Sequence, residues 1–117
     1  LGTHVSAIMA NDDELRDRVA AAAELAGESM WPMPLPPELR PSLNSKVADL
    51  ANIGERMGGM LTAGLFLSEF VTSGTSWAHL DIAGPAFNEG SPHGYTPAGG
   101  TGIAVRTLVA LAEQLAD

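Results

Sequence analysis

HVSAIMANDDELRDRVAAAAELAG, residues 4–27 of the 117-residue chain, is the stretch that decides the fold class. Residues 4–10 are short and mostly apolar, a pattern that predicts a buried strand. Asn11, with a glutamate three residues later, forms a capping-box pattern, so a helix is expected over residues 12–26. Apolar residues recur along it at helical spacing, and Gly27 can supply the left-handed residue that ends it. A strand that leads directly into a helix is the basic unit of an α/β fold.

Further elements are expected downstream. Residues 57–71 are apolar on most sides, which predicts a helix packed on two faces. Residues 77–83 alternate apolar and polar side chains, which predicts a strand. Thr101 can cap a last helix that reaches the C-terminus. The proline-rich residues 31–37 predict an extended connector that can include a short edge strand, whereas residues 47–53 leave a strand and a loop as alternatives.

The order of these elements predicts one partial domain over residues 1–117. Strands that alternate with helices favour α/β layers on a largely parallel sheet. Two clear strands are too few for such a sheet, so other polypeptide must complete it. The chain also starts almost directly on a buried strand, which points the same way. We therefore expect a segment of a larger domain.

The composition excludes several classes of partner. Six Lys and Arg against fourteen Asp and Glu give a formal net charge of −8 at pH 7, which repels nucleic-acid phosphates and anionic membrane surfaces. No apolar run approaches the roughly 18 residues that span a bilayer. The absence of cysteine excludes disulfides and thiolate metal sites. We expect a cytoplasmic protein with neither nucleic-acid nor membrane partners.

His79 and Asp81 form one candidate chemical pair. Two residues apart on a strand, their side chains project to the same face. They could act as two metal ligands, or as a base with its orienting acid. A structural role, with hydrogen bonds to neighbouring loops, is favoured because no third ligand is visible nearby.

Two glycine-rich segments are further candidates. Gly99–Gly102 precedes a helix, where backbone N–H groups and the helix dipole can hold an anion. The segment matches neither the P-loop nor the dinucleotide fingerprint, so a plain tight turn is favoured. Residues 84–100 form a connection longer than most, which can border a binding crevice or be a simple surface excursion.

Several stretches together resemble the leucyl aminopeptidase (cytosol aminopeptidase) family. They are MWPMPL (residues 30–35), ADLANIG (48–54), GMLTAGLFLSEFV (59–71), WAHLDIAG (77–84), and GGTG (99–102) followed by RTL (106–108). Their order and spacing also fit the family, and they span nearly the whole chain. The resemblance identifies the chain as the C-terminal part of the family's catalytic domain.

This resemblance implies a three-layer αβα metallopeptidase domain with a mostly parallel sheet. It implies a homohexameric, cytoplasmic enzyme that uses two divalent cations, zinc, manganese or magnesium, to release N-terminal residues from peptides. The family's Asn-Thr-Asp-Ala-Glu-Gly-Arg-Leu motif, which carries much of the metal-ligand set, is absent from this sequence. The chain is therefore expected to contribute no catalytic residue and no metal ligand. Alone it should be inactive, because it depends on the upstream part of the same enzyme.

What the resemblance carries over is part of the pocket for the substrate's first side chain, at Ile53, Ala83 and Ala86. The resemblance also places His79 and Asp81 on a scaffold strand, which lowers the metal interpretation of that pair. Two alternatives remain: a non-catalytic interaction or assembly fragment, suggested by the apolar helix and the incomplete sheet, and an anion-binding module at Gly99–Gly102.

Overall fold

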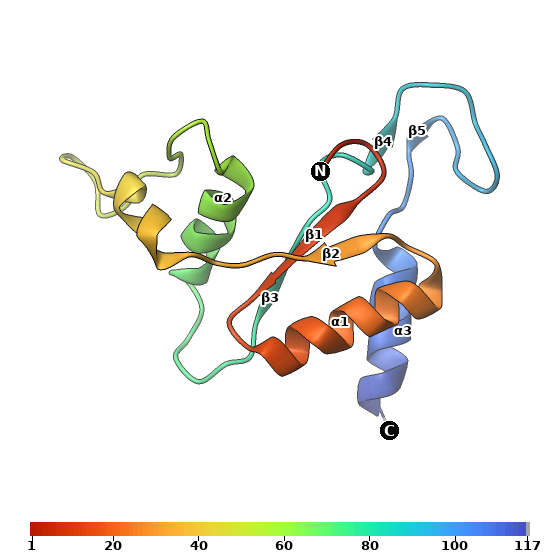
Figure 1. Cartoon of the computed structure of the whole chain (residues 1–117), viewed down its shortest axis with the longest axis horizontal. Helices are drawn as coiled ribbons and strands as arrows, with labels where there is room; N and C mark the ends of the chain where they lie inside the picture. Colours follow the sequence, from red (N-terminus) through yellow and green to blue (C-terminus); the bar gives the residue numbers. More distant parts are fainter. Residues whose placement is uncertain (117) are drawn as a thin grey trace.

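The central element of the fold is β1 (Ser6–Ala10), shown in Figure 1. The computed structural model describes residues 1–116. Strand β2 (Met30–Pro32) pairs with β1 in parallel, and β3 (Ala78–Asp81) pairs with its other edge in antiparallel orientation. The mixed α/β fold expected from the sequence is confirmed. The parallel pairing holds for β1 and β2, whereas β3 makes this three-stranded sheet mixed.

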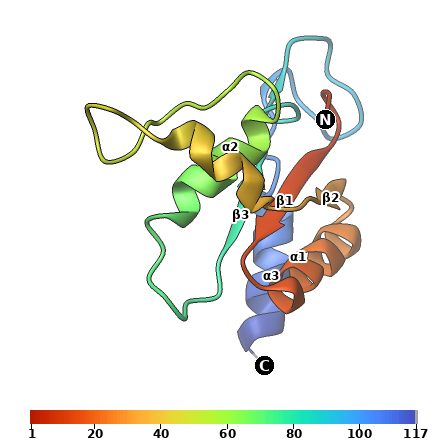
Figure 2. The same cartoon turned by 60° about the vertical axis from the view of Figure 1, so that its left-hand side comes forward.

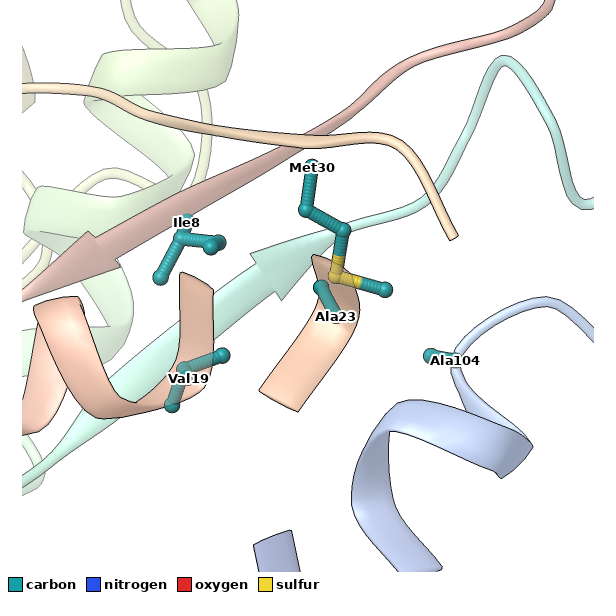
Figure 3. Packing of buried hydrophobic residues seen from close by; sticks show 5 residues of the cluster. All are labelled: Ile8, Val19, Ala23, Met30 and Ala104. Carbon is teal, nitrogen blue, oxygen red and sulfur yellow. The ribbon is translucent and has the colours of Figure 1, made fainter. Parts of the chain in front are cut away.

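Alternate residues of β1 serve two different helical layers. Ile8 belongs to the buried cluster of Figure 3, together with Val19 and Ala23 of α1 (Asp13–Ala26), Met30 of β2 and Ala104, which directly precedes α3 (Val105–Ala116). Met9, the next residue, faces α2 (Gly59–Ser68) on the opposite side of the sheet. Figure 2 shows α2 on one side of the strands and α1 with α3 on the other. The arrangement is a small three-layer sandwich.

The N-terminal cap of α1 is Asp12, so the predicted capping box at Asn11 is wrong. The Asp12 carboxylate Oδ1 accepts hydrogen bonds from the backbone N–H groups of Glu14, at 2.9 Å, and Leu15, at 3.4 Å. A carboxylate at this position also interacts favourably with the helix dipole. The predicted end is confirmed, since Gly27 has a left-handed φ of 75°.

The Asn11 side chain forms hydrogen bonds with a distant segment of the chain instead of capping α1. Its side-chain amide donates to the Thr75 carbonyl oxygen at 2.9 Å and accepts from the Trp77 N–H at 2.8 Å. Beside it, the Ser76 hydroxyl donates to Asp12 Oδ2 at 2.8 Å. These bonds attach the approach to β3 to the junction of β1 and α1. The Ser76 hydroxyl, followed by the Leu15 backbone N–H, holds the pKa of Asp12 below its ordinary value of 3.8.

The connector between β2 and α2 contains one element that the sequence does not predict. A 3₁₀ helix, η1 (Pro37–Leu43), follows the extended prolines and begins with a proline at its first position, where the missing N–H costs nothing. Residues 47–53 form a loop, which decides between the two alternatives left open. Helix α2 is shorter than the predicted 57–71, because Gly58 turns the chain with a φ of 71°. Its buried residues have two sets of neighbours: Gly64 lies against Met9 and Leu35, whereas Thr62 lies against Gly54, so the helix is packed on two sides, as predicted.

The segment after β3 folds back as a hairpin. β4 (Phe87–Asn88) pairs with β5 (Gly99–Gly100), and a bridge between His93 and Thr96 closes the tip. Helix α3 then packs against α1. Asp117, which the predicted last helix included, lies outside the described residues. None of the helices within residues 1–116 is long and apolar enough to cross a bilayer.

Replacing Gly64 with valine should destabilise the fold. A Cβ at Gly64 would lie 2.9 Å from Leu35 Cδ2 and 3.0 Å from Met9 Sδ, and overpacking of this kind costs about 1–3 kcal/mol. Urea unfolding measures the loss. Gly59→Val on the same helix is the matched control, because a Cβ there meets no atom within 4 Å. Equal losses in the two variants would contradict the packing described here.

Replacing Ser76 with alanine should raise the pKa of Asp12 toward its ordinary value of 3.8, because the hydroxyl is the largest cause of the lowered pKa. With the folded pKa below the unfolded one, ionised Asp12 stabilises the fold above about pH 3.8, and this stabilisation is lost as the pH falls through the folded pKa. Titration of the carboxyl resonance by NMR gives the pKa directly. Ser73→Ala, at an exposed serine in the same turn, should leave it unchanged.

Candidate functional site

A buried carboxylate, Glu28, organises the region where α1, β2 and α3 meet. It follows the helix-ending Gly27 and is 5% exposed. Its Oε2 accepts a hydrogen bond from the Ala104 N–H at 2.9 Å. Its Oε1 accepts from the Thr107 N–H at 2.9 Å and from the Thr107 hydroxyl at 2.7 Å. Glu28 is therefore the N-terminal cap of α3, supplied from a distant part of the chain, and its charge interacts favourably with the helix dipole.

The prediction that Thr101 caps the last helix is wrong, and the reason is geometrical. Helix α3 begins only at Val105, because Gly102 and Ala104 both adopt a positive φ, of 70° and 74°. Thr101 instead donates its hydroxyl to the Pro85 carbonyl oxygen at 2.6 Å and accepts from the Ile103 N–H at 3.3 Å. It fastens the turn after β3 to the start of α3.

The segment Gly99–Gly102 has other uses than the anion site considered above. Gly99 and Gly100 are paired in β5. The donors at the start of α3 already bind the Glu28 carboxylate, which fills the position that an external anion would take. Arg106 Nη2 lies 3.9 Å from Glu28 Oε2, and its guanidinium carbon is 4.2 Å from the centre of the Tyr95 ring. The plain structural interpretation of this segment is the one that the contacts support.

An open hollow of about 860 Å³ lies beside this cap. It is bounded by the residues before β1, the turn after β3, the β4–β5 hairpin and the start of α3. Its apolar wall includes Phe87 and Ile103, and its ionisable groups include His4, Glu89 and His93. The long connection after β3 therefore borders a concave surface.

The three predicted pocket residues lie on two separate segments. Ala83 lines the hollow, and its N–H donates to Asp81 Oδ1 at 3.2 Å. Ala86 is half-buried in the same turn; its N–H donates to the Ile82 carbonyl oxygen at 3.0 Å. Ile53 lies in the loop between η1 and α2 and is 79% exposed. The structure brings Ala83 and Ala86 together and leaves Ile53 on another loop.

His79 and Asp81 lie on one face of β3, as predicted, opposite Met9 and Ala7 of β1. The His79 ring stacks on that of Trp77, with centroids 6.4 Å apart. Asp81 accepts the hydrogen bond from the turn that follows the strand. Throughout residues 1–116, no three His, Cys, Asp or Glu side chains gather closely enough to hold a metal ion. Within these residues, His79 and Asp81 thus have no third side chain of this kind beside them, and the contacts they make are the local ones given above.

Glu28 is the site residue that the sequence analysis missed. The sequence signal that could have indicated this residue was its place: a glutamate directly after the glycine that ends a helix. Its partners are 76 and 79 residues away, so no local pattern connects it to α3.

Comparison with known proteins gives a consistent result. Residues 1–109 match the model of the cytosol aminopeptidase family, catalytic domain. The chain is 66% identical over 113 residues to a probable cytosol aminopeptidase of Streptomyces coelicolor, covering 97% of this chain and 22% of that protein. It is 55% identical over 117 residues to one from Mycobacterium tuberculosis, covering 99% and 22%.

Two solved structures have the same fold over this region. The bottromycin maturation enzyme BotP in complex with Mn matches with a TM-score of 0.93 and 46% identity, covering 98% of this chain and 25% of that one. A tomato leucine aminopeptidase mutant matches with a TM-score of 0.88 and 37% identity, covering 97% and 21%. The chain thus spans about a fifth to a quarter of the length of the proteins it matches.

Replacing Glu28 with glutamine should destabilise the attachment of α3. One of the two carboxylate oxygens becomes an NH₂ group, which faces an N–H donor, and a buried donor left unsatisfied costs about 1–3 kcal/mol. Urea unfolding and amide exchange at Thr107 measure the effect. Glu24→Gln, on the exposed side of α1, is the isosteric control. Unchanged exchange at Thr107 in Glu28→Gln would exclude the capping role.

Proposed function

Because the chain belongs to the cytosol aminopeptidase family, we propose that it is one segment of a leucyl aminopeptidase that removes N-terminal residues from peptides. The observation that carries the proposal is the family match over residues 1–109. Identities of 55–66% to the curated relatives over nearly the whole chain support it. The likeness to a leucine aminopeptidase structure, at a TM-score of 0.88, points in the same direction.

The cofactor of the complete enzyme is proposed to be a pair of divalent cations, manganese, zinc or magnesium. A related enzyme, BotP, has been solved in complex with Mn. The described residues of this chain gather no set of side chains suited to such ions. Other polypeptide must therefore supply the ligands, and this chain alone should neither bind the cations nor cleave peptides.

The role of this chain within the enzyme is proposed to be scaffold and substrate pocket. Ile53, Ala83 and Ala86 have small or aliphatic side chains, as a pocket for an apolar first residue requires. Ala83 supports the assignment because it lines the hollow beside the turn that also holds Ala86. The net charge of −8 agrees with a peptide substrate rather than a nucleic acid.

Assembly with further polypeptide is also proposed, as a homohexamer in the cytoplasm. Helix α3 exposes apolar side chains at helical spacing, at Val105, Leu108, Val109 and Leu115, each more than half exposed. An exposed apolar stripe of this kind marks a contact surface. The same surface would suit a non-catalytic interaction fragment. An assay of peptidase activity in the complete polypeptide distinguishes the two functions.

Filling the proposed pocket tests the function. In the complete polypeptide assayed with manganese, Ala83→Phe should lower kcat/KM for a leucine anilide by roughly 10- to 100-fold, since a few methylenes in an apolar pocket are worth this much. An alanine anilide should be affected less, because its small side chain leaves room. Ala21→Phe, at an exposed position of α1, is the control. Equal losses for both substrates would argue against the pocket, and a complete, metal-loaded protein without activity would refute the proposed function.

A further inference from the structure

The loop between η1 and α2 is held at two points, on either side of Ile53. Before it, the Ala51 N–H donates to the Leu43 carbonyl oxygen at 2.8 Å. After it, Gly54 lies directly against Ser42 of η1 and Thr62 of α2. Only one residue, Asn52, separates Ile53 from the first of these two contacts. The backbone around Ile53 is therefore tied on both sides to the same pair of elements.

The contact at Gly54 leaves less room than a side chain needs unless a neighbouring atom shifts. A Cβ at this position would lie 2.7 Å from Ser42 Oγ, and 3.2 and 3.3 Å from Thr62 Cγ2 and Cβ. The constraint is one of space rather than of backbone conformation, since Gly54 is not among the glycines with positive φ. Glycine thus permits a close approach that a side chain would push apart.

The two residues that receive Gly54 are themselves well fixed. The Ser42 hydroxyl donates to the Leu39 carbonyl oxygen at 2.8 Å. Thr62 is 4% exposed, and its hydroxyl donates to the Gly59 carbonyl oxygen at 3.0 Å. Shifting either residue therefore means breaking a hydrogen bond or moving buried atoms.

η1 and α2 are also joined to each other and to the sheet. An ion pair between Arg40 and Glu69 connects the two helices. Gly64 seats α2 against Met9, which is fully buried in β1. Contacts therefore run without interruption from the central strand, through α2, to Gly54. Ile53, whose apolar side chain is 79% exposed, directly precedes Gly54 at the end of this series of contacts.

We propose that Gly54, seated between Ser42 and Thr62, is a positioning residue that sets the place of Ile53 in the pocket for the substrate's first side chain. The inference rests on the proposed function, because it takes Ile53 as a wall of that pocket. Ser42 and Thr62 act through Gly54 and need not touch the substrate. The contact determines which first residues the enzyme prefers, rather than whether the enzyme turns over.

The test uses Gly54→Ala in the complete, manganese-loaded polypeptide. The added methyl group should displace Ile53, so KM for a leucine anilide is expected to rise about tenfold while kcat changes less than about twofold, the pattern of lost substrate binding. The preference for leucine over alanine anilide should fall by the same factor. Gly59→Ala, where a Cβ meets no atom within 4 Å, is the control and should change neither value.

Rescue separates positioning from a general loss of structure. Ser42→Ala removes the oxygen that would lie 2.7 Å from the new methyl group, the shortest of the contacts, and leaves those to Thr62 at 3.2 and 3.3 Å, so Gly54→Ala with Ser42→Ala should recover most of the wild-type preference. If Gly54→Ala fails to fold, Ser42→Thr crowds the same contact from the opposite side and is expected to raise KM in the same way. A double variant with unrestored preference would overturn the inference.

Ile53→Ala distinguishes the two levels of the proposal. A changed preference in Ile53→Ala together with an unchanged one in Gly54→Ala would reject the positioning role and leave the proposed function intact. An unchanged preference in Ile53→Ala would remove Ile53 from the pocket, and the inference with it. An inactive wild-type enzyme would reject the proposed function itself.

Discussion

The arrangement of the chain depends on the hydrogen bonds that the Glu28 carboxylate accepts from the start of α3. A buried charge is costly unless its hydrogen-bonding capacity is used, and here both oxygens accept bonds from the start of α3. Ala104, at the beginning of that helix, has a φ of 74°, a conformation that costs a non-glycine residue about 1–3 kcal/mol. The bond from its N–H to Glu28 helps to hold it there. One side chain, in the connection between α1 and β2, thus caps the start of α3.

Strand β1 connects the two sides of the molecule by simple alternation. Successive side chains of a strand point to opposite faces, so Ile8 packs under α1 and α3 while Met9 packs under α2. The absence of a side chain at Gly64 lets α2 come close enough to cover Met9. Packing on one face is thereby coupled to packing on the other, although the helices of the two layers lie far apart in the sequence.

Sequence patterns predicted what depends on neighbouring residues. The first strand, helix α1 and its end at Gly27, the extended connector of residues 31–37 and the family resemblance all rest on local spacing or on quoted motifs. The two wrong caps, at Asn11 and Thr101, failed for a shared reason. Asn11 bonds to a segment 64 to 66 residues away, and the residue that caps α3, Glu28, is 76 residues before Ala104. No periodicity indicates such pairings, nor the antiparallel direction of β3.

In the pocket that we propose, the two walls are attached to the same central strand. One wall, the turn of Ala83 and Ala86, follows β3, whose Leu80 lies opposite Ile8. The other, Ile53, is reached through α2, which rests on Met9. Both walls are therefore attached, through these contacts, to adjacent residues of one strand, Ile8 and Met9. A pocket built on two flexible loops would vary in width, whereas loops anchored to neighbouring positions of a buried strand keep a constant spacing. Discrimination between side chains that differ by one or two methylenes requires such a spacing, because each methylene contributes only about 1 kcal/mol.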